Sequence, residues 1–194
     1  AIGSQNGQVW KILNLEQPEI IVNLCAQGEG AASFGPEAWM FYRTNCAYLA
    51  QLCEIMRKKE WLQRFVHIST SELYGSSNYA VAEDAPVRAT SPYAISKAAF
   101  DQHLNIMHRI HGFQMNIIRP SNCYCPGQQL HRVIPQAIIA ALTGRKMKLH
   151  GGGHAEKSYL HADDLSRAIM AVIDHGKIGA TYNGGSVFPI KIRD

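Results

Sequence analysis

Two side chains in the middle of the sequence have the types and spacing of an acid–base pair. Tyr93 and Lys97 are four residues apart, so on a helix they lie on one face. A phenol normally titrates near pH ~10, and a nearby ammonium group favours the phenolate and lowers that pKa. The spacing therefore predicts that Tyr93 is a usable base near neutral pH, with the Thr70 hydroxyl holding the same substrate oxygen.

Two predicted elements would position this pair. Pro92 stands where a helix begins, because a missing N–H costs nothing there, and Gly112 ends the helix after His111. Upstream, residues 65–68 form an apolar run that we expect to be a buried strand, followed by hydroxyls, a carboxylate and a turn over 69–75. Alone, the Tyr and Lys spacing also fits a structural helix with an exposed Lys, so the pair indicates chemistry only together with this strand.

Further apolar patterns complete an alternation of strands and helices. Residues 19–26 form a continuous apolar run that is typical of a strand buried on both faces of a parallel sheet, and residues 113–120 predict another strand. Residues 37–60 repeat apolar side chains every three or four positions, as a helix does. This order predicts an α/β fold, a Rossmann-like parallel sheet flanked by helices. The repeating residues, which we expect in the core, are Trp39, Tyr42, Cys46, Leu49, Cys53 and Met56. The remaining predicted elements are a helix over 133–142, a short strand over 146–150 and an amphipathic helix ending near Asp174.

Composition narrows the class of protein. The 194 residues are enough for one domain with a core, and the apolar content of 46% and charged content of 18% are ordinary for a globular protein. The net charge of +4 suits an anionic ligand better than nucleic acid. Five cysteines at irregular spacing argue against a disulfide framework and for a reducing compartment. Neither they nor the histidines predict a metal site. No signal peptide is recognised and no apolar run approaches ~18 residues, so we expect a soluble, cytoplasmic protein that does not bind membranes.

The strand and helix motifs together resemble one known family. Residues 69–75 (STSELYG) and 91–101 (SPYAISKAAFD) are similar to segments of the extended short-chain dehydrogenase/reductase family, and within it of the nucleotide-sugar 4,6-dehydratases. The first segment resembles the GDP-mannose type and the second the dTDP-glucose type, and the resemblance covers nearly the whole chain. It implies an enzyme that uses NAD or NADP, acts on a nucleotide-diphosphate sugar and forms a homodimer through the helices over 37–60 and 92–111.

The resemblance also implies a catalytic set. Tyr93 takes the proton of the sugar 4-hydroxyl, Thr70 holds that oxygen, and Lys97 contacts the nicotinamide ribose. Glu72 removes the C5 proton and water leaves from C6. The role of Ser71 stays open, because the dTDP-glucose enzymes have Asp there as the acid for water loss and the GDP-mannose type does without it. If Ser71 cannot serve, Glu72 must be both base and acid.

Binding residues follow from the same resemblance. An Asn such as Asn45 steadies the backbone beside the active site in the family, although its spacing also fits the outer face of a helix. Lys157 stands where the family carries an Arg that grips the diphosphate, so it offers a point charge in place of a fork. Arg132 is a second candidate cation, and for both the plain alternative is a surface charge. The expected cofactor-binding residues are Leu24, Cys25, Ala26, Asn45, Ser69, Tyr93 and Lys97. The expected substrate-binding residues are Thr70, Asn122, Arg132 and Lys157.

Several positions differ from the family pattern or have a structural reading of their own. Cys125 stands where Gly is usual, which puts the loop conformation there in question. Asp163 and Asp164 are read as a helix cap and a first-turn acid. A glycine-rich strand–turn–helix segment that would receive the pyrophosphate is not found in the sequence, and after Asp194 the family would continue into another helix.

We therefore expect the central part of a longer enzyme. Residues 1–120 would be a partial NAD(P)-binding Rossmann-like domain, and residues 121–194 a partial substrate-binding region interleaved with the last sheet elements. Two alternatives remain open. One is a nucleotide-sugar epimerase on the same fold, which needs only the hydroxyl, Tyr and Lys and typically carries a small residue at the position of Glu72. The other is a non-catalytic remnant that has lost its cofactor site.

Overall fold

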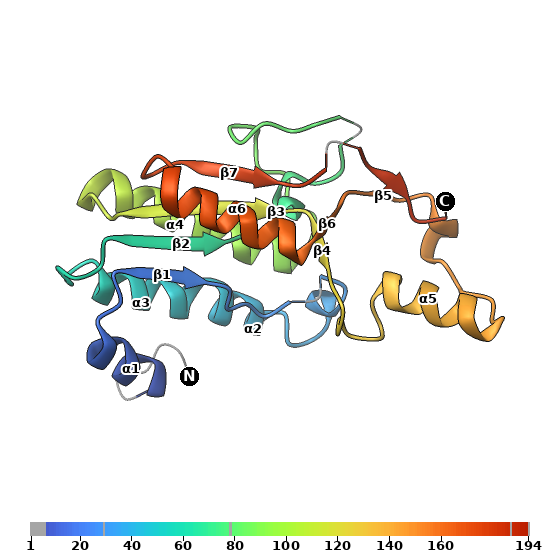
Figure 1. Ribbon diagram of the computed structural model, residues 1–194, viewed down its shortest axis with the longest axis horizontal. Coiled ribbons are helices and arrows are strands. Elements are labelled where there is room, and N and C mark those ends of the chain that lie inside the picture. The colour runs from blue at the N-terminus through green and yellow to red at the C-terminus, as the bar shows by residue number, and fades with distance from the viewer. Residues whose placement is uncertain (1–6, 29, 78, 187, 194) are drawn as a thin grey trace.

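A parallel sheet forms the centre of the molecule. The computed structural model describes residues 7–28, 30–77, 79–186 and 188–193. Within these residues the main sheet has four strands in the order β1-β2-β3-β7, all parallel (Figure 1). The strands are β1 (Ile20–Asn23), β2 (Arg64–Ile68), β3 (Met115–Pro120) and β7 (Thr181–Gly184). The predicted α/β, Rossmann-like sheet is therefore confirmed.

Helices cover both faces of this sheet. On one face lie α2 (Trp39–Tyr42), α3 (Tyr48–Met56) and α4 (Pro92–His111), and on the other lies α6 (Ala162–His175) (Figure 1). A π-helical turn, Arg43–Ala47, joins α2 to α3. The remaining helices and strands are α1 (Gln8–Glu16), α5 (Val133–Thr143), β4 (Asn122–Tyr124), β5 (Glu156–Lys157), β6 (Tyr159–His161) and β8 (Ile190–Lys191). Short 3₁₀ helices are formed by Ala32–Phe34, Ser71–Tyr74 and His150–Gly153.

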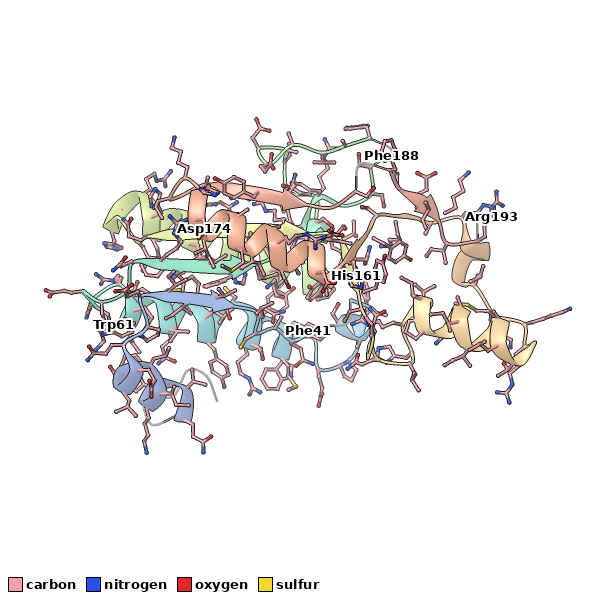
Figure 2. All side chains as sticks on the ribbon, in the orientation of Figure 1. Phe41, Trp61, His161, Asp174, Phe188 and Arg193 are labelled. Atoms are coloured by element: carbon pink, nitrogen blue, oxygen red, sulfur yellow. The ribbon has the colours of Figure 1, made fainter. Side chains whose placement is uncertain are left out.

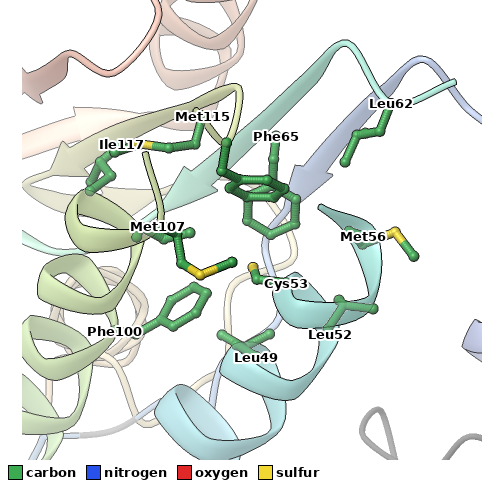
Figure 3. Close-up of a cluster of buried hydrophobic side chains, with 12 residues drawn as sticks. Leu49, Leu52, Cys53, Met56, Leu62, Phe65, Phe100, Met107, Met115 and Ile117 are labelled. Atoms are coloured by element: carbon green, nitrogen blue, oxygen red, sulfur yellow. The ribbon is translucent and has the colours of Figure 1, made fainter. Parts of the chain in front are cut away.

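The core is divided between the two faces because successive residues of a strand point in opposite directions. Phe65 of β2 packs with α3 and α4, where Phe100 and Met107 meet Leu49 and Cys53 (Figure 3). On the opposite face, the members of the cluster are Val66, Ile118, Leu165 and Val172. Burying one such side chain contributes roughly 1.5–3 kcal/mol, so the two clusters together hold β2 and β3 firmly in place.

The predicted bounds of α4 are confirmed by its end signals. Ser91 caps the helix, because its Oγ accepts a hydrogen bond from the Ala94 backbone N–H at 3.1 Å. Pro92 follows in the first turn, where its ring suits the helix. At the other end Gly112 has a φ of 64°, and its N–H donates to His108 O at 2.8 Å. These signals place Tyr93 in the first turn, with Lys97 one turn after it.

One predicted strand is absent, and another is present but differs in length and burial. Lys146 to Leu149 form no strand, and the chain turns instead into the 3₁₀ helix His150–Gly153, where Gly151 and Gly152 have positive φ angles. A strand needs a partner, and a local apolar pattern does not supply one. The strand predicted over 19–26 is shorter than expected and is not buried on both faces, since Ile20 is 42% exposed. Among the described residues β1 pairs only with β2, so it is an edge strand.

Trp39 and Tyr42 are a further correction, because both are exposed, at 54% and 38%, whereas Phe41 is buried. The π-helical turn adds a residue to one helical turn and so changes which side chains face the core. Leu49, Cys53 and Met56, which follow the turn, are buried as predicted.

Other expectations are settled by the backbone and the cysteines. Cys125 does not take the left-handed conformation, because Gln17 is the one non-glycine with positive φ among the described residues, and Gly127 supplies the turn with a φ of 79°. His161, labelled in Figure 2, is the N-cap residue of α6, and its Nδ1 accepts a hydrogen bond from the Asp163 backbone N–H at 3.2 Å. Asp163 and Asp164 are therefore first-turn acids only. All five cysteines are free.

Over the part of the chain that the structure describes, no helix has the length and apolarity needed to cross a membrane. The domain boundary at residue 120 stays a prediction, and β7 from the second part pairs with β3 in the main sheet.

Candidate active site

The candidate site lies where the parallel strands end. Ser69 and Thr70 follow β2, Cys25 follows β1, and Ser121 follows β3. Because these strands are parallel, their carboxyl ends share one edge of the sheet, where open α/β sheets bind ligands. The start of α4 reaches the same edge, since Lys97 Nζ lies 2.7 Å from Ile68 O at the end of β2. The fold therefore brings the two predicted motifs together.

Thr70, Glu72 and Tyr93 converge at this edge. Thr70 caps the 3₁₀ helix Ser71–Tyr74, and its Oγ1 accepts a hydrogen bond from Glu72 N at 3.2 Å. The phenol of Tyr93 is half-buried, and it interacts with the Thr70 hydroxyl and with the Glu72 carboxylate. The arrangement places a hydroxyl, a carboxylate and a phenol around one point, which is the set needed to hold a substrate oxygen and move protons beside it.

Gly30 is a site residue that the sequence prediction missed. A Cβ at this position would lie 3.2 Å from Glu72 Oε2 and 3.9 Å from Tyr93 Cδ1. The loop after β1 therefore passes against both catalytic candidates, and a side chain larger than hydrogen would press on the carboxylate. The signal available in the sequence was the pair of glycines at positions 28 and 30 directly after a strand.

The protonation of Tyr93 differs from the prediction. Burial raises the pKa of the Tyr93 phenol above its ordinary value, the hydrogen bond with Thr70 opposes this, and the Glu72 carboxylate adds to it. Arg132, at the start of α5, lowers the pKa of the phenol, so Arg132 is brought near the site. Lys97 is not among the groups that lower the pKa of Tyr93, so the expectation that Lys97 makes Tyr93 more acidic is wrong.

The amino group of Lys97 contacts His67 and the Ile68 carbonyl oxygen, so it is engaged by partners other than Tyr93. Its side chain is buried at 1% exposure, and Nζ donates to Ile68 O at 2.7 Å and lies 3.2 Å from His67 Nε2. Burial lowers the pKa of Lys97 from 10.5 to about 8, while the charges of Asp101 and Cys25 act in the opposite direction. Lys97 is thus held under the sheet edge, close to the loop that follows β1.

A buried ion pair behind Lys97 was also missed. Asp101 lies one helical turn after Lys97, and its Oδ2 accepts a hydrogen bond from Arg119 Nε at 3.0 Å. Arg119 also donates to Tyr74 Oη at 2.6 Å, and Tyr74 donates to Asn183 Oδ1 at 2.9 Å. This network links α4 to β3 and β7. The spacing of Tyr93, Lys97 and Asp101, each four residues apart on one helix face, could have indicated it.

The cofactor-binding candidates lie on the β1 side of the site. Asn45 is fully buried, so its outer-face alternative is excluded. Its Oδ1 accepts from Gln27 N at 2.7 Å, and its Nδ2 donates to Gln27 O at 3.0 Å and to Ser96 Oγ at 3.0 Å. These bonds hold the backbone of the loop after β1 against α4.

The same side carries exposed side chains and a buried hydroxyl. Leu24, Cys25 and Ala26 are exposed at the end of β1, and the Ser69 hydroxyl is buried and interacts with the Asp101 carboxylate. With Lys97 beside them, these groups fit the nicotinamide–ribose end of a dinucleotide. The sequence holds no glycine-rich segment for the pyrophosphate end.

Two of the four substrate-binding candidates, Asn122 and Lys157, line a cavity of about 670 Å³. Its walls include Ser71, Glu72, Asn122 and Lys157. Asn122 is partly engaged already, because its Nδ2 donates to Ser158 O at 3.3 Å. The residues that line the cavity do not include Thr70, Tyr93, Lys97 or Arg132. The cavity therefore reaches the catalytic candidates only through Ser71 and Glu72. A cation and an amide in the wall suit a polar, anionic ligand.

Comparisons with known proteins place these features in context. Residues 4–185 match the NAD dependent epimerase/dehydratase family. The chain is similar to the dTDP-glucose 4,6-dehydratase of Streptomyces niveus, with 36% identity over 168 residues that make up 86% of this chain and 49% of that protein. It is also similar to the dTDP-glucose 4,6-dehydratase of Mycobacterium tuberculosis, with 30% identity, 87% of this chain covered and 54% of that protein. The chain thus spans about half the length of these relatives.

Solved structures agree with the sequence comparisons. DesIV, a dTDP-glucose 4,6-dehydratase from Streptomyces venezuelae with NAD and TYD bound, aligns with a TM-score of 0.85 and 31% identity, over 94% of this chain and 57% of that one. UDP-glucuronic acid 4-epimerase from Bacillus cereus, in complex with UDP-glucuronic acid and NAD, aligns with a TM-score of 0.90 and 26% identity, over 100% of this chain and 61% of that one.

Proposed function

The chain belongs to the NAD dependent epimerase/dehydratase family, and from this premise we propose that the protein is a nucleotide-sugar 4,6-dehydratase. It converts a nucleotide-diphosphate sugar to the 4-keto-6-deoxy product by oxidation at C4, loss of water across C5 and C6, and return of the hydride to C6. The two dTDP-glucose 4,6-dehydratase relatives named above, at 36% and 30% identity, support this choice within the family.

The position of Glu72 is the observation that carries the proposal. An epimerase that only oxidises and reduces C4 needs a base and a hydroxyl, which Tyr93 and Thr70 supply. Here a carboxylate stands with them, close enough to raise the pKa of Tyr93, and Gly30 leaves room for it. A carboxylate beside the oxidation site is what removal of a proton from C5 requires, because a ketone at C4 makes that proton acidic.

The proton transfers are divided between Tyr93 and Glu72 in this scheme. Tyr93 first has to lose its own proton, because its raised pKa keeps the phenol protonated near neutral pH. As the phenolate it accepts the proton of the 4-hydroxyl, while Thr70 donates a hydrogen bond to the 4-oxygen. Glu72 then takes the C5 proton and delivers a proton to the departing 6-hydroxyl, which leaves as water. Ser71 lines the same cavity as Glu72, but a serine hydroxyl is a far weaker acid than a carboxyl group. Glu72 therefore serves as both base and acid. After it has given a proton to the departing hydroxyl, its carboxylate takes a proton from solvent and donates it to C5 at the end, while Tyr93 releases the proton of the 4-hydroxyl to solvent.

NAD, when bound, supplies the redox chemistry by taking the hydride from C4 and giving it back at C6. This chain would hold its nicotinamide end through Lys97 and the Ser69 hydroxyl, with Asn45 fixing the adjoining loop. NADP in place of NAD is decided by residues that bind the adenosine ribose, and this sequence offers no acidic residue after a glycine-rich turn for that purpose. The substrate diphosphate would be held by Lys157 and Arg132, with Asn122 beside Lys157 in the cavity wall.

The assembly we propose is a homodimer formed through α2, α3 and α4. Ile95, Ile106 and Ile110 are exposed at 45%, 49% and 63%, and their spacing puts them on one stripe of α4. Trp39 and Tyr42 add exposed aromatic rings on α2. A stripe of this kind is expected to be covered by a partner. Replacement of Ile106 by Lys should shift the protein from dimer to monomer in sedimentation, and an unchanged dimer would contradict this interface.

The free cysteines fit a cytoplasmic location.

The test of function is incubation of the protein with NAD or NADP and a panel of dTDP-, UDP- and GDP-sugars, followed by mass spectrometry. The proposal expects a product lighter than its substrate by one water. A product of unchanged mass with altered sugar stereochemistry would identify an epimerase instead. If no sugar is turned over and no cofactor is retained, the protein is a non-catalytic remnant.

A further inference from the structure

A polar chain that the proposed reaction does not use runs behind the catalytic residues. Lys97 Nζ lies 3.2 Å from His67 Nε2, and the other ring nitrogen, Nδ1, lies 2.9 Å from Asn23 Nδ2. The Asn23 Oδ1 in turn accepts a hydrogen bond from the backbone N–H of Cys25 at 3.2 Å. Lys97, His67 and Asn23 are only 1%, 0% and 6% exposed, so solvent has little access to these contacts.

The partners assign a donor or an acceptor to each atom. A backbone N–H can only donate, so Asn23 presents its oxygen to Cys25 and its NH₂ group to His67. An NH₂ group can only donate, so His67 Nδ1 is an acceptor. A neutral imidazole whose Nδ1 accepts carries its proton on Nε2. The Nε2–H then faces Lys97 Nζ, which can accept it only as a neutral amine.

A charged Lys97 requires a different arrangement. An ammonium group has no lone pair and must donate to Nε2, so the ring proton moves to Nδ1. Asn23 then has to turn its oxygen toward His67, which takes that oxygen away from the Cys25 N–H. The His67 ring does not carry a proton on both nitrogens, because burial and the charge of Lys97 lower the pKa of His67 well below its ordinary value. Asp101 Oδ1 is 3.9 Å from Nε2, too far for a hydrogen bond.

We infer that His67 is a positioning residue that transmits the charge of Lys97 to the loop after β1. With a neutral Lys97 the ring proton is on Nε2 and Asn23 holds the Cys25 N–H. With a charged Lys97 the ring proton is on Nδ1 and the Cys25 N–H is released. The inference rests on the proposed function in one respect, since that function makes Lys97 a catalytic residue and the loop a cofactor contact.

Both states are accessible near physiological pH, because burial lowers the pKa of Lys97 to about 8. Three ionisable groups face Lys97 from the elements around it: His67 from β2, Asp101 from its own helix α4, and Cys25 from the end of β1. Asp101 and Cys25 favour the charged amine, and Arg119 of β3 pairs with Asp101 at 3.0 Å. Protonation of Lys97 is thus the event that sets His67.

The test is nitrogen NMR of the protein labelled at histidine, without cofactor or substrate, from about pH 6.5 to about pH 9.5. The inference predicts that the His67 proton moves from Nδ1 to Nε2 with a midpoint near the Lys97 pKa of about 8. In Lys97→Met the proton should stay on Nε2 throughout. His108 is an internal control, because its Nδ1 faces the carbonyl oxygen of Phe113 at 3.0 Å, which can only accept. A constant His67 tautomer in the unaltered protein, or the same switch in Lys97→Met, would overturn the inference.

The loop has its own readout in amide hydrogen exchange. The Cys25 amide should exchange faster, relative to the Gln27 amide, as the pH falls through about 8. Gln27 is the matched control, since its N–H is held by Asn45 Oδ1 at 2.7 Å and not by the His67 chain. A ratio of the two rates that is independent of pH contradicts the inference.

Turnover separates this inference from the proposed function. His67→Gln keeps a hydrogen-bonding side chain but has no tautomer to switch, so its pH profile of turnover should differ from that of the unaltered protein while the sugar KM is kept. Identical profiles would refute the positioning role. A protein that shows the NMR switch but dehydrates no sugar refutes only the proposed function, and one that dehydrates without the switch refutes only this inference.

Discussion

The lowered pKa of Lys97 has a consequence for stability that can be calculated from the structure. The pKa of its side chain falls from 10.5 to about 8 on folding because the ammonium group is buried. Between these two values the unfolded chain binds more protons than the folded one, so the free energy of unfolding rises with pH in this window. Below about pH 8 both states are protonated and the full penalty remains. The gap corresponds to about 3 kcal/mol at roughly 1.4 kcal/mol per pH unit.

Comparison with Lys97→Met isolates this contribution. Methionine has a similar length and no charge, so the variant loses the titration together with the hydrogen bond to Ile68 O. The difference in unfolding free energy between the unaltered protein and the variant should grow in favour of the unaltered protein by about 2 kcal/mol from about pH 8 to about pH 10. Other groups that titrate in this range cancel in the difference.

The assay is urea unfolding followed by tryptophan fluorescence at a series of pH values. The absolute difference at any one pH includes the lost hydrogen bond, so the change with pH is the quantity to compare. If the difference in unfolding free energy between the two proteins stays constant from about pH 8 to about pH 10, the folding of the chain does not lower the pKa of Lys97. The reasoning about its burial is then refuted. A difference that changes in the opposite direction would refute it equally.

Four further variants and one control variant test the site. Tyr93→Phe should reduce turnover by about 100-fold to 10,000-fold with the fold retained, as measured by product formation and circular dichroism. Glu72→Gln should stop water loss while still reducing added NAD, and full dehydration by this variant would remove Glu72 from the scheme. Gly30→Ala should lower turnover by about tenfold to a hundredfold, because its Cβ would sit 3.2 Å from Glu72 Oε2. Gly28→Ala, whose Cβ meets nothing within 4 Å, is its control and should be fully active. Asn45→Ala, which loses three hydrogen bonds, one buried and two partly buried, should cost about 2–4 kcal/mol of stability in urea and weaken NAD binding in calorimetry.

Elements with strong local signals could be predicted from the sequence. The bounds of α4 follow from Ser91, Pro92 and Gly112, each of which acts on the neighbouring backbone whatever the rest of the fold does. The strand β2, which begins at Arg64, could also be predicted from a local signal, because its apolar run fits a buried parallel strand. The convergence of Thr70 and Tyr93 follows from these two elements, because a parallel sheet brings its strand ends to one edge.

Features that depend on distant partners could not be predicted in this way. The pattern over 146–150 suits a strand, but no neighbouring strand pairs with it. Trp39 has the right periodicity for the core, yet the π-helical turn alters the buried face. Lys97 has a long side chain that could reach several acceptors, and only the three-dimensional structure shows that Ile68 O and His67 are its partners.

The central claim is tested most directly by following hydrogen through the reaction. The protein is given a nucleotide sugar deuterated at C4 and NAD in ordinary water, and the product is examined by mass spectrometry and NMR. A 4,6-dehydratase should yield a product lighter by one water that carries the deuterium on its new methyl group at C6. In deuterium oxide with unlabelled sugar, one solvent deuterium should appear at C5, where Glu72 returns the proton. A product that has not lost water, keeps the deuterium at C4 and shows no exchange at C5 would contradict the account. Such a product would identify an epimerase.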